Sequence, residues 1–149
     1  MPVQTIKSIT KKIPGGLAVE SQSRKFRIIV DEPKNMGGLD TGMTPMEILL
    51  ASLGSCLTIV AYSFAASKDI KIEDMWVEVE GDMDLAGFMH GEPGVRPGFQ
   101  TIRPTMHIRS DAPAEKIQEF QKFVESRCPI TDTVLHGTRL LFNKVVIEK

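Results

Sequence analysis

The sequence predicts an α+β fold with the element order β-β-β-α-β-β-α-β, in which antiparallel sheets wrap around a long buried central helix. Residues 46–67 are apolar or small on every side, with no charge between Glu47 and Lys68. A helix with this composition has to be buried. The segments before and after it alternate polar and apolar residues, which is typical of strands. These strands come in runs rather than alternating with helices, which favours antiparallel sheets.

The N-terminal part of the chain is predicted to hold three short strands. Residues 3–12 mix β-branched and polar side chains, and 17–21 and 26–30 follow as two further strands after a Pro-Gly-Gly turn at 14–16. Residues 35–42 contain three glycines. We therefore expect a loop to lead into the central helix.

The start of the central helix carries a capping box. Thr44 is expected at the N-cap, Pro45 at the first helical position and Glu47 at the third. A helix over 46–67 would be about 33 Å long. In a chain of 149 residues, such a helix is expected to be the centre of the fold.

Two strands, a second helix and a final strand are predicted in the second half. The strands are 76–80 and 99–109, with an edge position or a bulge at Pro104, and the glycine-rich residues 86–98 between them form a loop. An amphipathic helix starts at an Asp111 N-cap and stops at Pro129. A short helical turn over 131–136 and a strand over 140–147 complete the predicted order.

Composition limits the class of protein. The length suits one domain over 1–149, and the net charge of −1 argues against nucleic acid as the main partner. No run of about 18 apolar residues suggests a membrane span, and the N-terminus lacks the layout of a signal peptide. We expect a cytoplasmic protein. The scattered cysteines and histidines match no zinc spacing, so no metal site is expected.

Two cysteines are the candidates for chemistry. Cys56 lies in the middle of the predicted central helix beside the small residues Gly54 and Ser55, and Cys128 lies on the apolar stripe of the second helix. Face-to-face packing of the helices would bring the thiols together. One thiolate can then attack a peroxide to give a sulfenic acid, and the other can condense with it to a disulfide. The alternative is that both are small hydrophobic core residues.

Three segments resemble the OsmC/Ohr family, the osmotically inducible and organic hydroperoxide resistance proteins. They are 44–56 (TPMEILLASLGSC), 127–133 (RCPITDT) and 95–99 (VRPGF). The resemblance implies an intertwined homodimer with active sites at the subunit interface. It also implies that Cys56 is the peroxidatic and Cys128 the resolving cysteine in the reduction of organic hydroperoxides. Neither a metal nor a bound organic cofactor is implied, and a dithiol reductant recycles the disulfide.

The sequence departs from the family pattern near the helix start. The peroxidases have a glutamate ten residues before the first cysteine, where this chain has Met46. Glu47 is rotated by about 100° from that position, and the capping box explains it. The family's catalytic arginine comes from a variable N-terminal region, in which Arg24 and Arg27 are candidates. The chain therefore resembles the OsmC-like branch more than the hydroperoxide-resistance enzymes proper.

These observations favour a cysteine-based peroxidase of oxidative stress defence. The alternative is a protein that binds a small molecule or senses electrophiles, in which Cys56 is modified without efficient turnover. A third interpretation is a structural dimer with inert thiols. A reactive Cys56 is expected to have a pKa below about 7.5. Burial alone would raise this pKa, so a nearby cation is required, and Arg24, Lys25 and Arg27 are the candidates.

Overall fold

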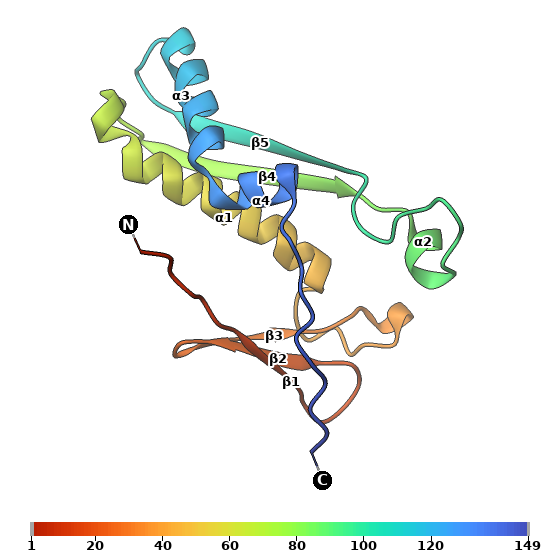
Figure 1. Ribbon diagram of the computed structural model, residues 1–149. Helices are drawn as coiled ribbons and strands as arrows, with labels where there is room; N and C mark the ends of the chain where they lie inside the picture. The colour runs from red at the N-terminus through yellow and green to blue at the C-terminus, as the bar shows by residue number, and fades with distance from the viewer. Residues whose placement is uncertain (1, 149) are drawn as a thin grey trace. The chain divides into compact units, whose positions relative to one another are not determined.

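The computed structural model describes residues 2–148 and has the α+β architecture that the sequence predicts (Figure 1). By its internal contacts the chain divides into two compact units, Met1–Ala51 and Ser52–Lys149. The central helix α1 (Pro45–Phe64) starts in the first unit and continues into the second. That the whole chain is one domain stays a prediction.

The first unit contains a three-stranded antiparallel sheet. Its strands β1 (Ile9–Lys12), β2 (Val19–Ser23) and β3 (Phe26–Val30) are neighbours in chain order. The third strand matches its prediction, whereas the first begins later than the predicted 3–12. Only Ile9–Lys12 pair with β2, and this pairing sets the limits of β1. The second strand is shifted by two residues from the predicted 17–21.

The loop after β3 is organised by a buried carboxylate. Asp31 is only 2% exposed. It accepts hydrogen bonds from the backbone N–H groups of Glu32 (2.8 Å), Leu39 (3.1 Å) and Thr41 (3.1 Å), and from the Thr41 hydroxyl (2.8 Å). Burial by itself would raise the pKa of Asp31, but these hydrogen bonds, led by that of the Thr41 hydroxyl, lower it to about 2. The carboxylate thus closes the loop, which includes the 3-10 turn η1 (Lys34–Met36).

The predicted capping box at the start of α1 is confirmed. The Thr44 N–H donates to the Glu47 carboxylate (2.7 Å), and the Glu47 N–H donates to the Thr44 hydroxyl (3.2 Å). The helix ends at Phe64, three residues before the predicted end. A 3-10 turn, η2 (Ala66–Lys68), continues it and ends at Asp69, which has a left-handed φ of 51°.

The second unit is built on a pair of long antiparallel strands, β4 (Asp74–Asp82) and β5 (Thr101–Arg109). Figure 1 shows α1 running along this pair, with the amphipathic helix α3 (Ala114–Arg127) beside it. Most apolar side chains of both strands face the core, as the alternation predicts. Trp76 of β4 does not: it is 51% exposed and stacks on the His107 ring of β5, with ring centroids 4.6 Å apart. Pro104 pairs in register with Val79 without a bulge. In a two-stranded sheet every strand is an edge, so the edge position predicted for Pro104 is confirmed.

Only one face of α1 is buried in the single chain. Leu53, Leu57 and Ala61 pack in a core with Phe120 and Val124 of α3, because one strand pair and one amphipathic helix cover a single side of α1. The opposite face is open, with Ile59 65% and Tyr62 50% exposed. A single chain therefore provides only part of the burial that is predicted for this helix. By length and hydropathy α1 also meets the criteria for a membrane-spanning helix, as core helices of soluble proteins often do.

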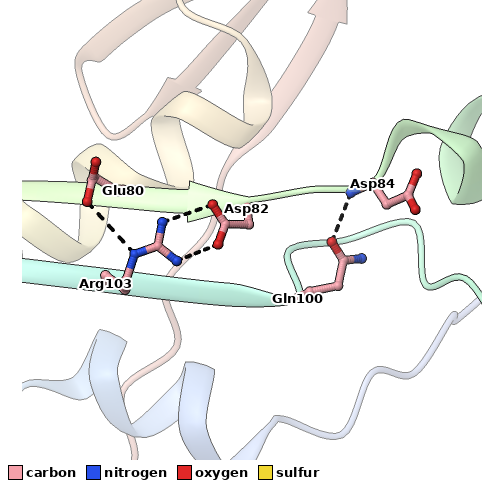
Figure 2. Close-up of polar contacts among 5 residues, drawn as sticks. All are labelled: Glu80, Asp82, Asp84, Gln100 and Arg103. Carbon is pink, nitrogen blue, oxygen red and sulfur yellow. Dashed lines mark hydrogen bonds and ion pairs between the residues drawn. The ribbon is translucent and has the colours of Figure 1, made fainter.

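The segment between β4 and β5 is more ordered than the loop predicted for it. It includes the short helix α2 (Leu85–Met89), whose N-cap Asp84 accepts a hydrogen bond from the Ala86 N–H (2.9 Å). Figure 2 shows the Gln100 side chain accepting from the Asp84 N–H (2.9 Å). The Gln100 amide also donates to the carbonyl groups of Arg96 (3.0 Å) and Gly98 (2.8 Å). Gln100 therefore ties together both ends of this segment.

The polar face of the strand pair carries cross-strand ion pairs. Arg103 of β5 forms a two-pronged hydrogen bond with Asp82 of β4 and lies 3.8 Å from the Glu80 carboxylate (Figure 2). The hydrogen bond to Arg103 lowers the pKa of Asp82. These groups are solvent-exposed, so their contribution to stability is small. They lie at the end of β4 and β5 that is next to the Gln100 contacts.

The C-terminal part departs from the predictions in two places. The N-cap of α3 is Pro113 rather than Asp111, because proline disfavours helical geometry in the residue before it and so excludes Ala112. The predicted turn over 131–136 is the helix α4 (Pro129–His136), which accepts proline at its first position. The strand predicted over 140–147 is absent from the described structure. A strand needs a neighbour, and the described chain offers it none.

The hydrogen bonds of Asp31 predict a pH dependence of stability. The folded-state pKa of about 2 lies below the unfolded value of about 3.9. The stabilisation is therefore complete above about pH 4 and is lost as the pH falls through 2. Asp31→Asn should unfold at lower denaturant concentration than wild type at pH 7, and the difference should narrow toward pH 2. Chemical unfolding at a series of pH values measures this. The matched control Asp40→Asn, at an exposed position of the same loop, should keep the wild-type profile. If the difference in unfolding midpoint between wild type and Asp31→Asn were constant from pH 7 to 2, the lowered pKa of Asp31 would be contradicted.

Candidate functional site

The structure brings the two predicted cysteines together. The Sγ atoms of Cys56 and Cys128 lie 2.8 Å apart, and both residues are free thiols. A disulfide has an S–S distance of about 2.05 Å, so a small local shift is enough to join them. Cys128 is only 1% exposed, whereas Cys56 is partly exposed. A small molecule arriving from solvent therefore meets Cys56 first.

Helix packing explains why residues so far apart in the sequence meet. Residues three or four positions apart lie on the same face of a helix, and Cys56 shares the buried face of α1 with Leu53 and Leu57. Phe120 and Val124 of α3 pack against this face, and Cys128 follows at the next helical spacing. The contact between the two apolar stripes thus sets one thiol opposite the other.

Cys128 has a second structural role as the N-cap of α4. Its backbone is extended (φ −78°, ψ 112°), and its Sγ accepts a hydrogen bond from the Thr131 N–H at 3.4 Å. A helix N-terminus favours negative charge because its N–H groups are unpaired and its dipole is positive there. The position therefore stabilises a thiolate on Cys128.

The pKa values of the two thiols are shifted in opposite directions. Burial raises the pKa of Cys56, and its hydrogen bond with Cys128 raises it further. Burial alone would also raise the pKa of Cys128, but hydrogen bonds from Cys56, from Thr131 and from the Ile130 backbone outweigh it and lower this pKa. The first negative charge of the pair therefore belongs on Cys128. This differs from the expected lowered pKa at Cys56, because a helix cap on the second cysteine was not part of that expectation.

The cationic candidates lie in the first unit. The Arg24 guanidinium is 5.0 Å from the centroid of the Phe26 ring, on the turn between β2 and β3, and the Lys25 ammonium is 5.5 Å from the same ring. Arg27 pairs with Glu20 at 3.4 Å. The three residues make these contacts within Met1–Ala51, whereas both cysteines belong to Ser52–Lys149. A role for Arg24 or Arg27 in catalysis stays a prediction.

A cavity of about 550 Å³ is lined by residues that neighbour the two cysteines in the sequence, although neither cysteine lines it. Its volume is typical of small-molecule sites. Its apolar residues include Leu53 and Leu57, which flank Cys56 along α1. Thr131, whose backbone N–H donates to the capping Cys128 sulfur, also lines the cavity. Polar residues are present too, and His136 lies 3.0 Å from the Asp132 carboxylate. The other lining residues are Ile102, Pro104, Lys122, Glu125, Ser126, Val134 and Leu135. This cavity is not predictable from the sequence, since α1, β5, α3 and α4 each contribute only part of its lining.

Across residues 2–148, no three His, Cys, Asp or Glu side chains come together in a way that would hold a metal ion. The chemistry that the described site offers is that of two thiols, a helix N-terminus and an adjoining cavity.

Comparison with known proteins relates this arrangement to one family. The profile of the family described as OsmC-like protein matches residues 38–141. A hydroperoxide reductase of Mycoplasma genitalium is 30% identical over 131 residues, which cover 87% of this chain and 86% of that protein. The crystal structure of an OsmC-like protein from Mycoplasma pneumoniae has a TM-score of 0.76 at 25% identity, over 88% of this chain and 87% of its own. An organic hydroperoxide resistance protein from Elizabethkingia anophelis shares the fold, with a TM-score of 0.64 at 18% identity over 90% of each chain.

The opposite pKa shifts predict how the reduced thiols titrate. Thiolate absorbance near 240 nm, followed against pH, should rise in two steps, because the pair shares a proton. Cys128→Ser should remove the lower step and leave a thiol that ionises above the usual value of about 8.5. Cys56→Ser should keep an ionisation below the usual value for a thiol, because the helix cap on Cys128 remains. Loss of the lower step in Cys56→Ser, and not in Cys128→Ser, would show that the charge belongs to Cys56.

Proposed function

Since the chain belongs to the OsmC-like protein family, we propose that it is a cysteine-based peroxidase that reduces organic hydroperoxides in defence against oxidative stress. The observation that carries the proposal is the 2.8 Å contact between a partly exposed thiol, Cys56, and a buried thiol, Cys128. The similarity to a protein named hydroperoxide reductase supports it independently.

In the first step, Cys56 is the nucleophile because it is the accessible sulfur. The thiol pair with one negative charge transfers its shared proton to Cys128 over 2.8 Å, which leaves a thiolate on Cys56. This sulfur attacks the terminal oxygen of the hydroperoxide, the O–O bond breaks, and the sulfur is oxidised by two electrons to a sulfenic acid. The Cys128 proton passes, directly or through water, to the departing alkoxide. The products are the alcohol, the Cys56 sulfenic acid and a Cys128 thiolate.

In the second step, the Cys128 thiolate attacks the Cys56 sulfur. The S–S bond forms as the S–O bond breaks, and the hydroxide leaves as water after taking a proton from solvent. A dithiol reductant then attacks the disulfide and is itself oxidised to a disulfide, which returns both cysteines to thiols. The cavity beside Leu53 and Leu57 offers an apolar surface to the organic group of the hydroperoxide.

We also propose that the working form is a homodimer. The open face of α1 exposes Ile59 and Tyr62, and the C-terminal segment exposes Phe142 (91%), Val145 (90%) and Ile147 (83%). Apolar surface on this scale is unusual for a protein that stays monomeric. The strand predicted over 140–147 would gain a neighbour if it paired with a second chain. We expect the protein to act in the cytoplasm, where a reducing environment keeps the two thiols free between catalytic cycles.

The peroxidase proposal predicts distinct effects of the two cysteine substitutions. Wild type should consume cumene hydroperoxide with a dithiol such as dithiothreitol. Cys56→Ser should lose activity by about 100-fold or more, because serine is not oxidised by peroxide under these conditions. Cys128→Ser should complete one turnover and leave a Cys56 sulfenic acid that dimedone traps. A wild-type protein that binds or is modified by the hydroperoxide without catalytic turnover would favour the sensing alternative.

The dimer is tested by light scattering at micromolar concentration, which should give twice the mass of the 16.5 kDa chain. We expect an interface well above the roughly 1,600 Å² of a standard complex, since α1 and the C-terminal segment both contribute. A double substitution, Ile59→Asp with Tyr62→Asp, should shift the mass toward that of one chain, because it places charge on the open face of α1. A wild-type monomer at these concentrations would rule out the dimer.

A further inference from the structure

The two thiols are placed so that one atom could bind both sulfurs. Cys56 and Cys128 are both free, and their Sγ atoms lie 2.8 Å apart. The helices that carry them share a core that includes Leu57, Phe120 and Val124, so packing holds the sulfurs at this spacing. Cys56 is partly exposed, whereas Cys128 is 1% exposed. A ligand that arrives from solvent therefore reaches Cys56 first and is then next to the second sulfur.

The spacing of the sulfurs limits which atom can join them. A zinc–sulfur bond is about 2.3 Å long, and an atom that bound two sulfurs in a straight line with bonds of this length would hold them about 4.6 Å apart. A pyramidal atom whose bonds of similar length meet near a right angle would hold them only about 3.3 Å apart. Trivalent arsenic is pyramidal and binds sulfur strongly. The pair at 2.8 Å therefore fits trivalent arsenic after a small local shift, whereas a linear metal ion would have to separate two packed helices.

The number of ligands limits the class of arsenical. Arsenite has three exchangeable oxygens and is held best by three thiols, whereas an arsenical with one carbon substituent has only two positions to exchange. Across residues 2–148, no group of three His, Cys, Asp or Glu side chains forms a ligand set. Two thiols without a third ligand match an arsenical that carries one carbon substituent.

The bonds form without any change in oxidation state. Thiolates are the form of cysteine that binds soft atoms, and the Cys128 sulfur accepts a hydrogen bond from the Thr131 N–H (3.4 Å) at the start of α4. Counted from two neutral thiols and a hydrated arsenical, two As–S bonds form and two As–O bonds break. Each oxygen leaves as water with one thiol proton, and arsenic stays trivalent. No oxidant or reductant is needed.

We propose that Cys56 and Cys128 form a binding site for trivalent arsenicals with one carbon substituent, in which arsenic joins the two sulfurs. While such a molecule is bound, neither sulfur is free to react with an oxidant. The proposal goes beyond the proposed function and does not rest on it, because the binding step uses no peroxide.

The probe is phenylarsine oxide, added in equimolar amount to the reduced chain with an excess of glutathione. Intact-mass measurement should show one phenylarsenic group per chain, and both cysteines should be protected from iodoacetamide. Glutathione, a monothiol, should leave the group in place, whereas dimercaptopropanol, a dithiol, should remove it. Cys56→Ser and Cys128→Ser should each bind the group about 100-fold more weakly, because the second As–S bond is no longer intramolecular. Arsenite should be lost at glutathione concentrations that leave the phenylarsenic group bound.

A matched control keeps the number of thiols and changes only their placement. Cys128→Ser combined with Ser67→Cys has two cysteines, but the second is at an exposed position of the turn η2 after α1, and it should bind as weakly as Cys128→Ser. If circular dichroism shows that loss of the Cys128 cap unfolds α4, Cys56→Ser combined with Ser67→Cys takes its place. A phenylarsenic group that glutathione removes from wild type, or that the control retains as tightly as wild type, would overturn the proposal. Neither result depends on whether the protein reduces hydroperoxides.

Discussion

The contact between the apolar stripes of α1 and α3 is the interaction on which the site depends. Leu53 and Leu57 of one helix meet Phe120 and Val124 of the other, and this packing carries Cys56 and Cys128 to within 2.8 Å. The same contact fixes where α3 ends and α4 begins. Because α4 has no buried residue of its own, its position relies on this junction. One packing interaction therefore determines the thiol pair, its helix cap and a wall of the cavity.

The two cysteines differ in the two properties that cysteine peroxidase chemistry needs, access to solvent and stabilisation of a thiolate. Cys56 is accessible but carries the raised pKa, and Cys128 is buried at a helix N-terminus that favours its thiolate. The accessible sulfur and the sulfur that favours the negative charge are thus different atoms. One hydrogen bond joins them, and a proton can move along it. The family peroxidases are expected to activate the first cysteine with an arginine held by a glutamate. Here Glu47 is engaged in the capping box, and the second cysteine with its helix cap provides a different place for the charge.

The two units of the chain contribute differently. The residues matched by the OsmC-like family profile, 38–141, cross the boundary between the units. The second unit contains the thiols and the cavity, and the first contains Arg24 and Arg27 with the Asp31 loop. The open face of α1 gives a physical reason for the expected intertwined dimer. A helix that is apolar all round is only half covered by its own chain.

The sequence alone determined the local structure, because capping, turns and alternation act over a few residues. Thr44 and Glu47 predicted the start of α1, and the alternation in β5 predicted which residues lie on each face. The segments around the two cysteines indicated the family. Only the tertiary structure decided the rest. The strand expected over 140–147 found no neighbour in a single chain. The distribution of charge between the thiols depends on which sulfur caps a helix and which faces solvent. Those are properties of packing between distant segments, which periodicity along the chain does not encode.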